Sequence, residues 1–100
     1  MQRFIIPRTI PGAGNMTEAE LAEVSKTSNE AVASLNVPYT WITTYVTDDV
    51  LFCVHEAEDE ETIREHARRG GFPVDSVLMV RSEFGPGTAD LLDEPATAGR

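Results

Sequence analysis

The fold of this chain is decided by residues 41–57, which read Trp-Ile-Thr-Thr-Tyr-Val-Thr-Asp-Asp-Val-Leu-Phe-Cys-Val-His-Glu-Ala. β-Branched and aromatic residues are frequent in both halves of this segment, and such residues favour strands. The Asp48-Asp49 pair between the halves is typical of a turn. We therefore predict a β-hairpin, with one strand over residues 39–47 and its partner over residues 50–57.

The hairpin carries large apolar side chains on both of its faces. Because side chains alternate along a strand, we expect Trp41 and Tyr45 to share one face of the first strand. Cys53 and His55 should share one face of the second strand for the same reason. A sheet with apolar groups on both faces needs cover on both sides.

A helix is predicted on each side of the hairpin. Thr17 and Glu20 match a capping box at the start of the first helix, and Asn36 ends it before a proline two residues later. Asp59 is the expected N-cap of the second helix, which the Gly70-Gly71 pair ends.

Two further apolar runs supply the outer elements. Phe4-Ile5-Ile6 predicts a strand within residues 3–8, which Pro7 makes short or places near an edge. Residues 75–81 contain Ser-Val-Leu-Met-Val and predict the last strand. The order β-α-β-β-α-β indicates an α+β fold of the ferredoxin-like type, a four-stranded antiparallel sheet with two helices on one face.

The helices of such a fold leave one face of the sheet uncovered. Since the hairpin is apolar on both faces, we infer that this face meets a second copy in a homodimer or encloses a cavity. Residues 1–83 are expected to form the domain, and residues 84–100 to form a flexible tail.

Composition restricts the class of protein. A chain of 100 residues with 41% hydrophobic and 25% charged residues is typical of one globular domain. No apolar run approaches the ~20 residues of a membrane span, and the apolar part of the N-terminus is too short for a signal peptide, so we predict a cytoplasmic protein. The net charge of −9 argues against nucleic acid and membrane partners and attracts cations.

The only cysteine and both histidines lie between residues 53 and 66. Cys53 and His55 could offer adjacent ligands to Zn, Ni or Cu, although two ligands do not complete a site. The alternative is a buried thiol and a hydrogen-bonded histidine of the sheet. His66, on the apolar side of the second helix, is either structural or a ligand or acid–base group. It can approach Cys53 only if that helix packs over the Cys53 face.

Other patterns allow two interpretations each. The acidic run 56–61 could hold a cation weakly, or it forms a solvated loop and the acidic start of a helix. Trp41 and Tyr45 could line a pocket, or they belong to the core or a dimer interface. The sequence contains no phosphate-binding loop and no recognisable Ser-His-acid arrangement.

Three short motifs together resemble the DUF4242 family: Trp41-x-x-Thr44-Tyr45, Cys53-x-His55-x-Ala57, and His66-Ala67 followed by Gly71-x-Pro73. One branch of that family, from actinomycetes, is described as nickel-binding or nickel-responsive, ferredoxin-like and homodimeric. The resemblance implies a dimer that binds Ni²⁺ or another divalent transition metal. The matching positions that can ligate nickel are Cys53, His55 and His66, and relatives often have Tyr at position 55, which weakens His55 as a general ligand.

Three functions remain open from the sequence. The first is a small metal-binding protein that buffers or senses nickel, without catalysis. The second is a small-molecule binder or enzyme that uses the uncovered sheet face, with His55 or His66 as the acid–base group. The third is an interaction module without chemistry.

Overall fold

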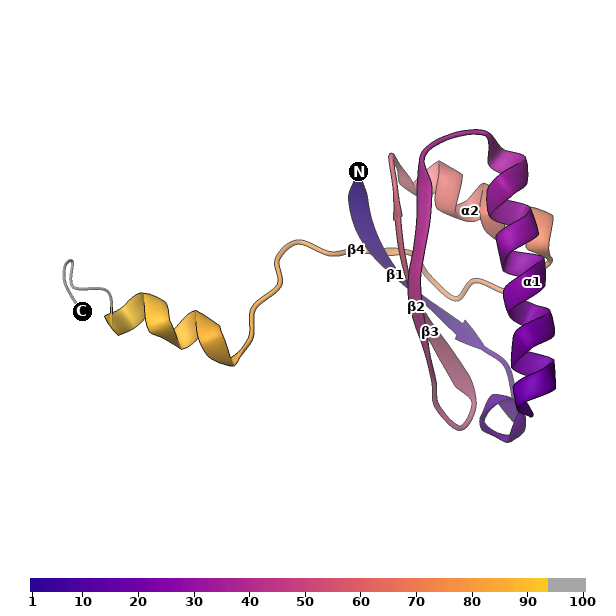
Figure 1. The fold of residues 1–100 in the computed structure, drawn as a ribbon, viewed down its shortest axis with the longest axis horizontal. Coiled ribbons are helices and arrows are strands. Elements are labelled where there is room, and N and C mark those ends of the chain that lie inside the picture. The colour runs from indigo at the N-terminus through magenta and orange to yellow at the C-terminus, as the bar shows by residue number, and fades with distance from the viewer. Residues whose placement is uncertain (94–100) are drawn as a thin grey trace.

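The computed structural model describes residues 1–93, which form a four-stranded antiparallel sheet with two helices on one face (Figure 1). The elements, in chain order, are β1 (Gln2–Thr9), the short 3-10 helix η1 (Ala13–Asn15), α1 (Glu18–Leu35), β2 (Tyr39–Val46), β3 (Val50–Ala57), α2 (Glu60–Gly70), β4 (Leu78–Met79) and the 3-10 helix η2 (Pro86–Asp93). The strand order is β2-β3-β1-β4. The predicted α+β fold of βαββαβ order is therefore confirmed.

Both long helices begin and end at the predicted residues. The Thr17 side chain accepts a hydrogen bond from the backbone N–H of Glu20, and the Glu20 side chain accepts one from the N–H of Thr17. Asp59 caps α2 by accepting from the N–H of Thr62. Asn36 and Gly71 end the helices in the left-handed conformation, with φ of 55° and 73°. These caps satisfy backbone groups that the helix ends leave unpaired.

Strand β1 is longer and more central than Pro7 suggested. It pairs with β3 along its whole length, from Gln2 opposite Ala57 to Thr9 opposite Val50. The carbonyl of Pro7 accepts a hydrogen bond from the N–H of Asp75, on the side away from β3. Because the N and C=O of a strand residue point the same way, the missing N–H of Pro7 removes no bond to β3.

The last strand is much shorter than the predicted residues 75–81. Only Leu78 and Met79 pair with β1 as a ladder. Backbone hydrogen bonds from Asp75 to Pro7 and from Val80 to Arg3 hold the segment beside β1 at both ends. The segment thus follows the edge of the sheet without keeping a continuous strand register.

The prediction that Trp41 and Tyr45 share a face is wrong. A β-bulge between Trp41 and Thr43 inserts one residue, so that Trp41 lies opposite His55 while Tyr45 lies opposite Phe52. A bulge shifts the alternation of every following side chain. Trp41 therefore faces the helices, and Tyr45 faces the other side of the sheet.

The helices cover the sheet unevenly. The core lies between them and the sheet and includes the buried side chains of Phe4, Ile6, Leu51 and Ile63. Within α1, only Ser28 and Ala31 are buried. A cavity lies between α1 and the sheet, lined by Leu21 and Val24 among others.

The other face of the sheet has no cover among the described residues, and it presents Tyr45 and Phe52, which are 63% and 37% exposed. Beyond β4 the chain leaves the sheet, and η2 stands away from the domain on the side opposite the helices (Figure 1). The predicted tail lies partly outside the described residues, because these end at residue 93. No described helix combines the length and apolar character needed to cross a membrane.

Candidate functional site

The histidines lie together beneath the helices. His55 projects from β3 toward the helices, and His66 projects from α2 toward the sheet. Their ring centroids are 5.0 Å apart, with an angle of 63° between the planes. Helix α2 thus packs over the Cys53 side of the sheet, the alternative that sequence reasoning left open. We call His55, His66 and the adjacent Tyr39 the histidine cluster.

His55 is held by residues of β2. It is 1% exposed, and its Nδ1 atom lies 2.6 Å from the Tyr39 hydroxyl. The Trp41 ring stacks beside it at 6.4 Å. Burial, together with the nearby His66 and the Arg8 guanidinium, lowers the pKa of His55 to about 3. The ring is therefore neutral at pH 7, and Nδ1 is engaged, which leaves Nε2 as its available nitrogen.

His66 is completely buried, and its Nε2 atom lies 3.1 Å from the Ser28 hydroxyl of α1. Its ring stacks between Tyr39, at 5.1 Å, and Phe72, at 5.7 Å. The Nδ1 atom has no hydrogen-bond partner within the part of the chain that the structure describes. Burial, with a contribution from Arg8, lowers the pKa of His66 to about 4. An unpartnered buried ring nitrogen is rare and marks a place where a ligand could bind.

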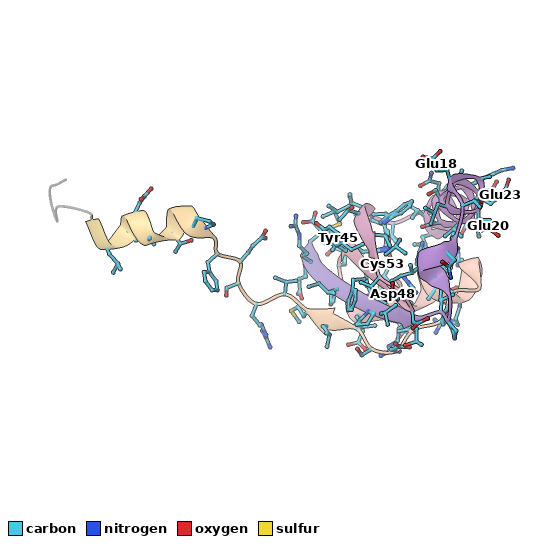
Figure 2. All side chains as sticks on the ribbon, turned by 90° about the horizontal axis from the view of Figure 1, so that it is seen from below. Glu18, Glu20, Glu23, Tyr45, Asp48 and Cys53 are labelled. Carbon is cyan, nitrogen blue, oxygen red and sulfur yellow. The ribbon has the colours of Figure 1, made fainter. Side chains whose placement is uncertain are left out.

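Cys53 lies inside the domain, away from the surface glutamates of α1 (Figure 2). It shares a face with His55, as predicted, and it is a free thiol. Its sulfur accepts a hydrogen bond from Nε of Arg8, at 3.2 Å. Arg8 also donates from Nη1 to the carbonyl of Pro73, at 2.8 Å, and its guanidinium lies 5.4 Å from the Phe72 ring centroid. A cation therefore already occupies the space beside the thiol.

A cavity of about 410 Å³ separates α1 from the sheet and borders these groups. We call it the α1–sheet cavity. Its lining comprises Arg8, Met16, Leu21, Val24, Ser25, Ser28, Trp41, Ile42, Thr43, Thr44, Val46, Leu51, Cys53, His55, His66 and Phe72. The cavity lies on the helix side of the sheet, so His55 and His66 are not available to a ligand on the uncovered face. The prediction that a small molecule on the uncovered face uses His55 or His66 as its acid–base group is therefore wrong, because both side chains lie on the other side of the sheet.

Four of the five carboxylates in the acidic run 56–61 make structural contacts. Glu56 pairs with Arg3 at 3.0 Å, and Asp59 caps α2. Glu60 and Glu61 pair with arginines of the same helix. These contacts agree with the interpretation of a solvated loop and helix start rather than a cation site.

The donor atoms near the two histidines decide whether a metal ion fits there. Two neutral imidazoles suit nickel, zinc and copper, and neither needs to lose a proton before it binds a metal. No group of three or more His, Cys, Asp and Glu side chains within residues 1–92 is arranged to hold a metal. The chain thus offers an imidazole pair whose chemistry fits a transition metal, and it needs further ligands from elsewhere.

Sequence reasoning did not identify Arg8, Tyr39 or Phe72 as part of the site. The spacing of Phe4, Ile6 and Arg8 does place Arg8 on the buried face of β1, which is a usable signal. Tyr39 and Phe72 have no comparable local signal, because their contacts with the histidines depend on how distant elements pack.

Comparison with known proteins identifies the family. Residues 4–80 match the family described as nickel responsive protein SCO4226-like. This chain belongs to that family. The match names this family rather than DUF4242, so the DUF4242 resemblance stays a prediction.

A solved structure of similar fold supports the architecture. The crystal structure of SCO4226 from Streptomyces coelicolor A3(2) superposes with a TM-score of 0.69 at 14% sequence identity. The superposition covers 82% of this chain and 99% of that chain. At this identity the similarity concerns the fold alone. No curated protein sequence matches this chain.

Proposed function

We propose that this protein binds a divalent transition metal, with Ni²⁺ as the first candidate, and that His55 and His66 supply imidazole ligands to it. The observation that carries the proposal is the buried, unpartnered Nδ1 of His66, 5.0 Å between ring centroids from a second neutral histidine. The family description, which concerns nickel response, supports the choice of metal.

The remaining ligands come from water, since two imidazoles do not saturate nickel. The Arg8 guanidinium borders the same cavity and opposes a cation there. We therefore expect modest affinity in the isolated chain. Buffering or sensing of nickel is compatible with binding of this strength.

Cys53 is the weakest of the three predicted ligands. Its sulfur already accepts a hydrogen bond from Arg8, and a metal would have to displace that contact. Substitution of Cys53 by Ser tests its participation, because the hydroxyl can still accept from Arg8 but is a poor ligand for a soft metal.

The test uses variants that keep the observed hydrogen bonds. His66→Gln retains a polar group toward Ser28 and removes Nδ1, whereas His55→Asn retains an acceptor toward Tyr39 and removes Nε2. Ni²⁺ titration by calorimetry should show one ion per chain in the native protein, and at least about tenfold weaker binding in each variant.

Glu23→Gln is the matched control for adventitious binding to surface carboxylates. Glu23 lies on the outer surface of α1 (Figure 2), and its substitution should leave nickel affinity unchanged. Equal and weak nickel uptake by native protein and both histidine variants would overturn the proposal.

We also infer that the chain forms a homodimer through the uncovered face of the sheet. Tyr45, Phe52 and Leu78 present exposed apolar surface there, and such a surface usually marks an interface. A second copy of the chain is the proposed occupant, because most soluble oligomers are homo-oligomers and two-fold dimers are the commonest of these.

A further inference from the structure

The α1–sheet cavity differs from the rest of the molecule in its charge. The chain has 17 acidic and 8 basic residues, yet the cavity lining contains one arginine and no aspartate or glutamate. Arg8 is therefore the only Lys, Arg, Asp or Glu side chain among the described residues of the lining, and it is positive.

Arg8 has no anionic partner among the described residues. It is 2% exposed, and its hydrogen bonds go from Nε to a thiol and from Nη1 to a backbone carbonyl. The ion pairs of the described residues involve Arg3, Arg64, Arg68 and Arg69 instead. A buried charge without a counterion is costly, because neutral acceptors replace only part of its lost hydration. The guanidinium retains N–H donors that these bonds do not use.

Two more polar groups border the same space. His66 is completely buried, with an Nδ1 that has no hydrogen-bond partner among the described residues, and the Ser28 hydroxyl lies 3.1 Å from its Nε2. Most of the remaining lining is apolar, including Leu21 and Val24 of α1 and Leu51 of β3. A volume of about 410 Å³ lies within the range of roughly 300–1,000 Å³ found for small-molecule sites. An apolar wall with a few convergent polar groups is the usual composition of such sites.

We propose that the α1–sheet cavity binds a small organic monocarboxylate with an apolar body. The carboxylate pairs with the guanidinium of Arg8, which supplies the missing counterion through charge-assisted hydrogen bonds. The apolar body lies between α1 and the sheet and removes the half-buried side chains of Leu21 and Val24 from water. This proposal goes beyond nickel binding and does not require a metal.

The experiment uses the full chain in the presence of a chelator, with octanoate as the probe. Octanoate should bind with saturation near one molecule per chain and raise the melting temperature. Octanol and octylamine, which have the same apolar body without the negative charge, should bind at least about tenfold more weakly. Equal binding of octanol and octanoate would overturn the role of Arg8.

Two kinds of variant test the location. Arg8→Gln should weaken octanoate at least about tenfold, and the exposed Arg81→Gln is the matched control that should have no effect. Leu21→Trp fills the cavity from a half-buried helix position and replaces no residue of the buried core, so it keeps the test valid if Arg8→Gln fails to fold. It should abolish octanoate binding.

The outcomes separate this proposal from that of nickel binding. Octanoate binding that survives Leu21→Trp, or no binding to the native chain, would overturn the carboxylate proposal and leave the nickel titration unaffected. If the native protein does not bind nickel, the proposed function is overturned. The octanoate result is unaffected, because octanoate binding is measured in the presence of a chelator.

Discussion

Neighbouring residues of β1 experience two different environments. Ile6 and Arg8 face the helices and are almost completely buried, whereas Ile5 and Arg3 face the other side and stay partly exposed. Arg3 forms a partly exposed ion pair with Glu56, whereas the buried Arg8 donates to a thiol and to a backbone carbonyl. Isoleucine and arginine thus occur on both faces of the same strand, and the face determines their burial and their contacts.

The comparison shows where chemistry is favoured in this fold. Burial on the covered face lowers the pKa values of both histidines, and the Arg8 guanidinium there has no counterion among the described residues. The uncovered face has apolar groups and a solvated ion pair, which suit contact with another protein surface. We therefore assign ligand binding to the covered face and assembly to the uncovered face.

The largest expected effect is on the free energy of unfolding, and it compares how tightly side chains are packed on the two faces of β1. Ile6→Ala removes a side chain that is 0% exposed and should lower the free energy of unfolding by about 2–5 kcal/mol, since it leaves a cavity in the core. Ile5→Ala is the matched control on the adjacent position and should cost less than half as much. Urea denaturation monitored by circular dichroism measures both. Equal losses would mean that the uncovered face is packed as tightly as the covered one.

An intermediate effect comes from the titration of the two histidines. The folded protein holds the pKa of His55 at about 3 and that of His66 at about 4, so below about pH 6.5 the unfolded chain binds more protons than the folded one. The free energy of unfolding should therefore fall as pH decreases from 6.5 to 5, by up to about 1.4 kcal/mol per pH unit for each histidine. Urea denaturation in metal-free buffer across this range measures the slope.

The control for this slope removes both titrating groups. The double variant His55→Asn, His66→Gln should have a much flatter dependence over the same pH range, because the chain has no other histidine. An unchanged slope in the double variant would show that the histidines are not buried as described.

The smallest effect on folding, and the clearest on assembly, is expected on the uncovered face. The double variant Tyr45→Ser, Phe52→Ser should dissociate the dimer. It should change the free energy of unfolding of the monomer by no more than about 0.5 kcal/mol. Light scattering after size exclusion, over a dilution series, measures the mass. Val37→Ser, at an exposed apolar residue outside the sheet, is the control. A native protein that is monomeric at every concentration would contradict the dimer.

Much of the fold could be predicted from local chemistry. Thr17 and Asp59 begin helices because their side chains accept from free backbone N–H groups, and Gly71 ends one because it adopts a positive φ. The hairpin followed from β-branched residues around two aspartates. The βαββαβ order then limited the topology, since short connections favour few arrangements.

The parts that could not be predicted depend on pairing between distant segments. The bulge between Trp41 and Thr43 moves each following side chain of β2 to the opposite face of the sheet from the one predicted. No local sequence pattern indicates such an inserted residue. The last strand kept only Leu78 and Met79 in register, because its pairing is set by β1 rather than by its own apolar run.

The helix ends, the hairpin, the element order and the groups able to bind a metal (Cys53, His55 and His66) follow from residue type or from contacts within a few residues. Contacts between distant elements place α2 over the Cys53 face, Arg8 beside the thiol and a cavity between α1 and the sheet. Packing of distant elements sets burial, and burial sets the charge state and partners of each group.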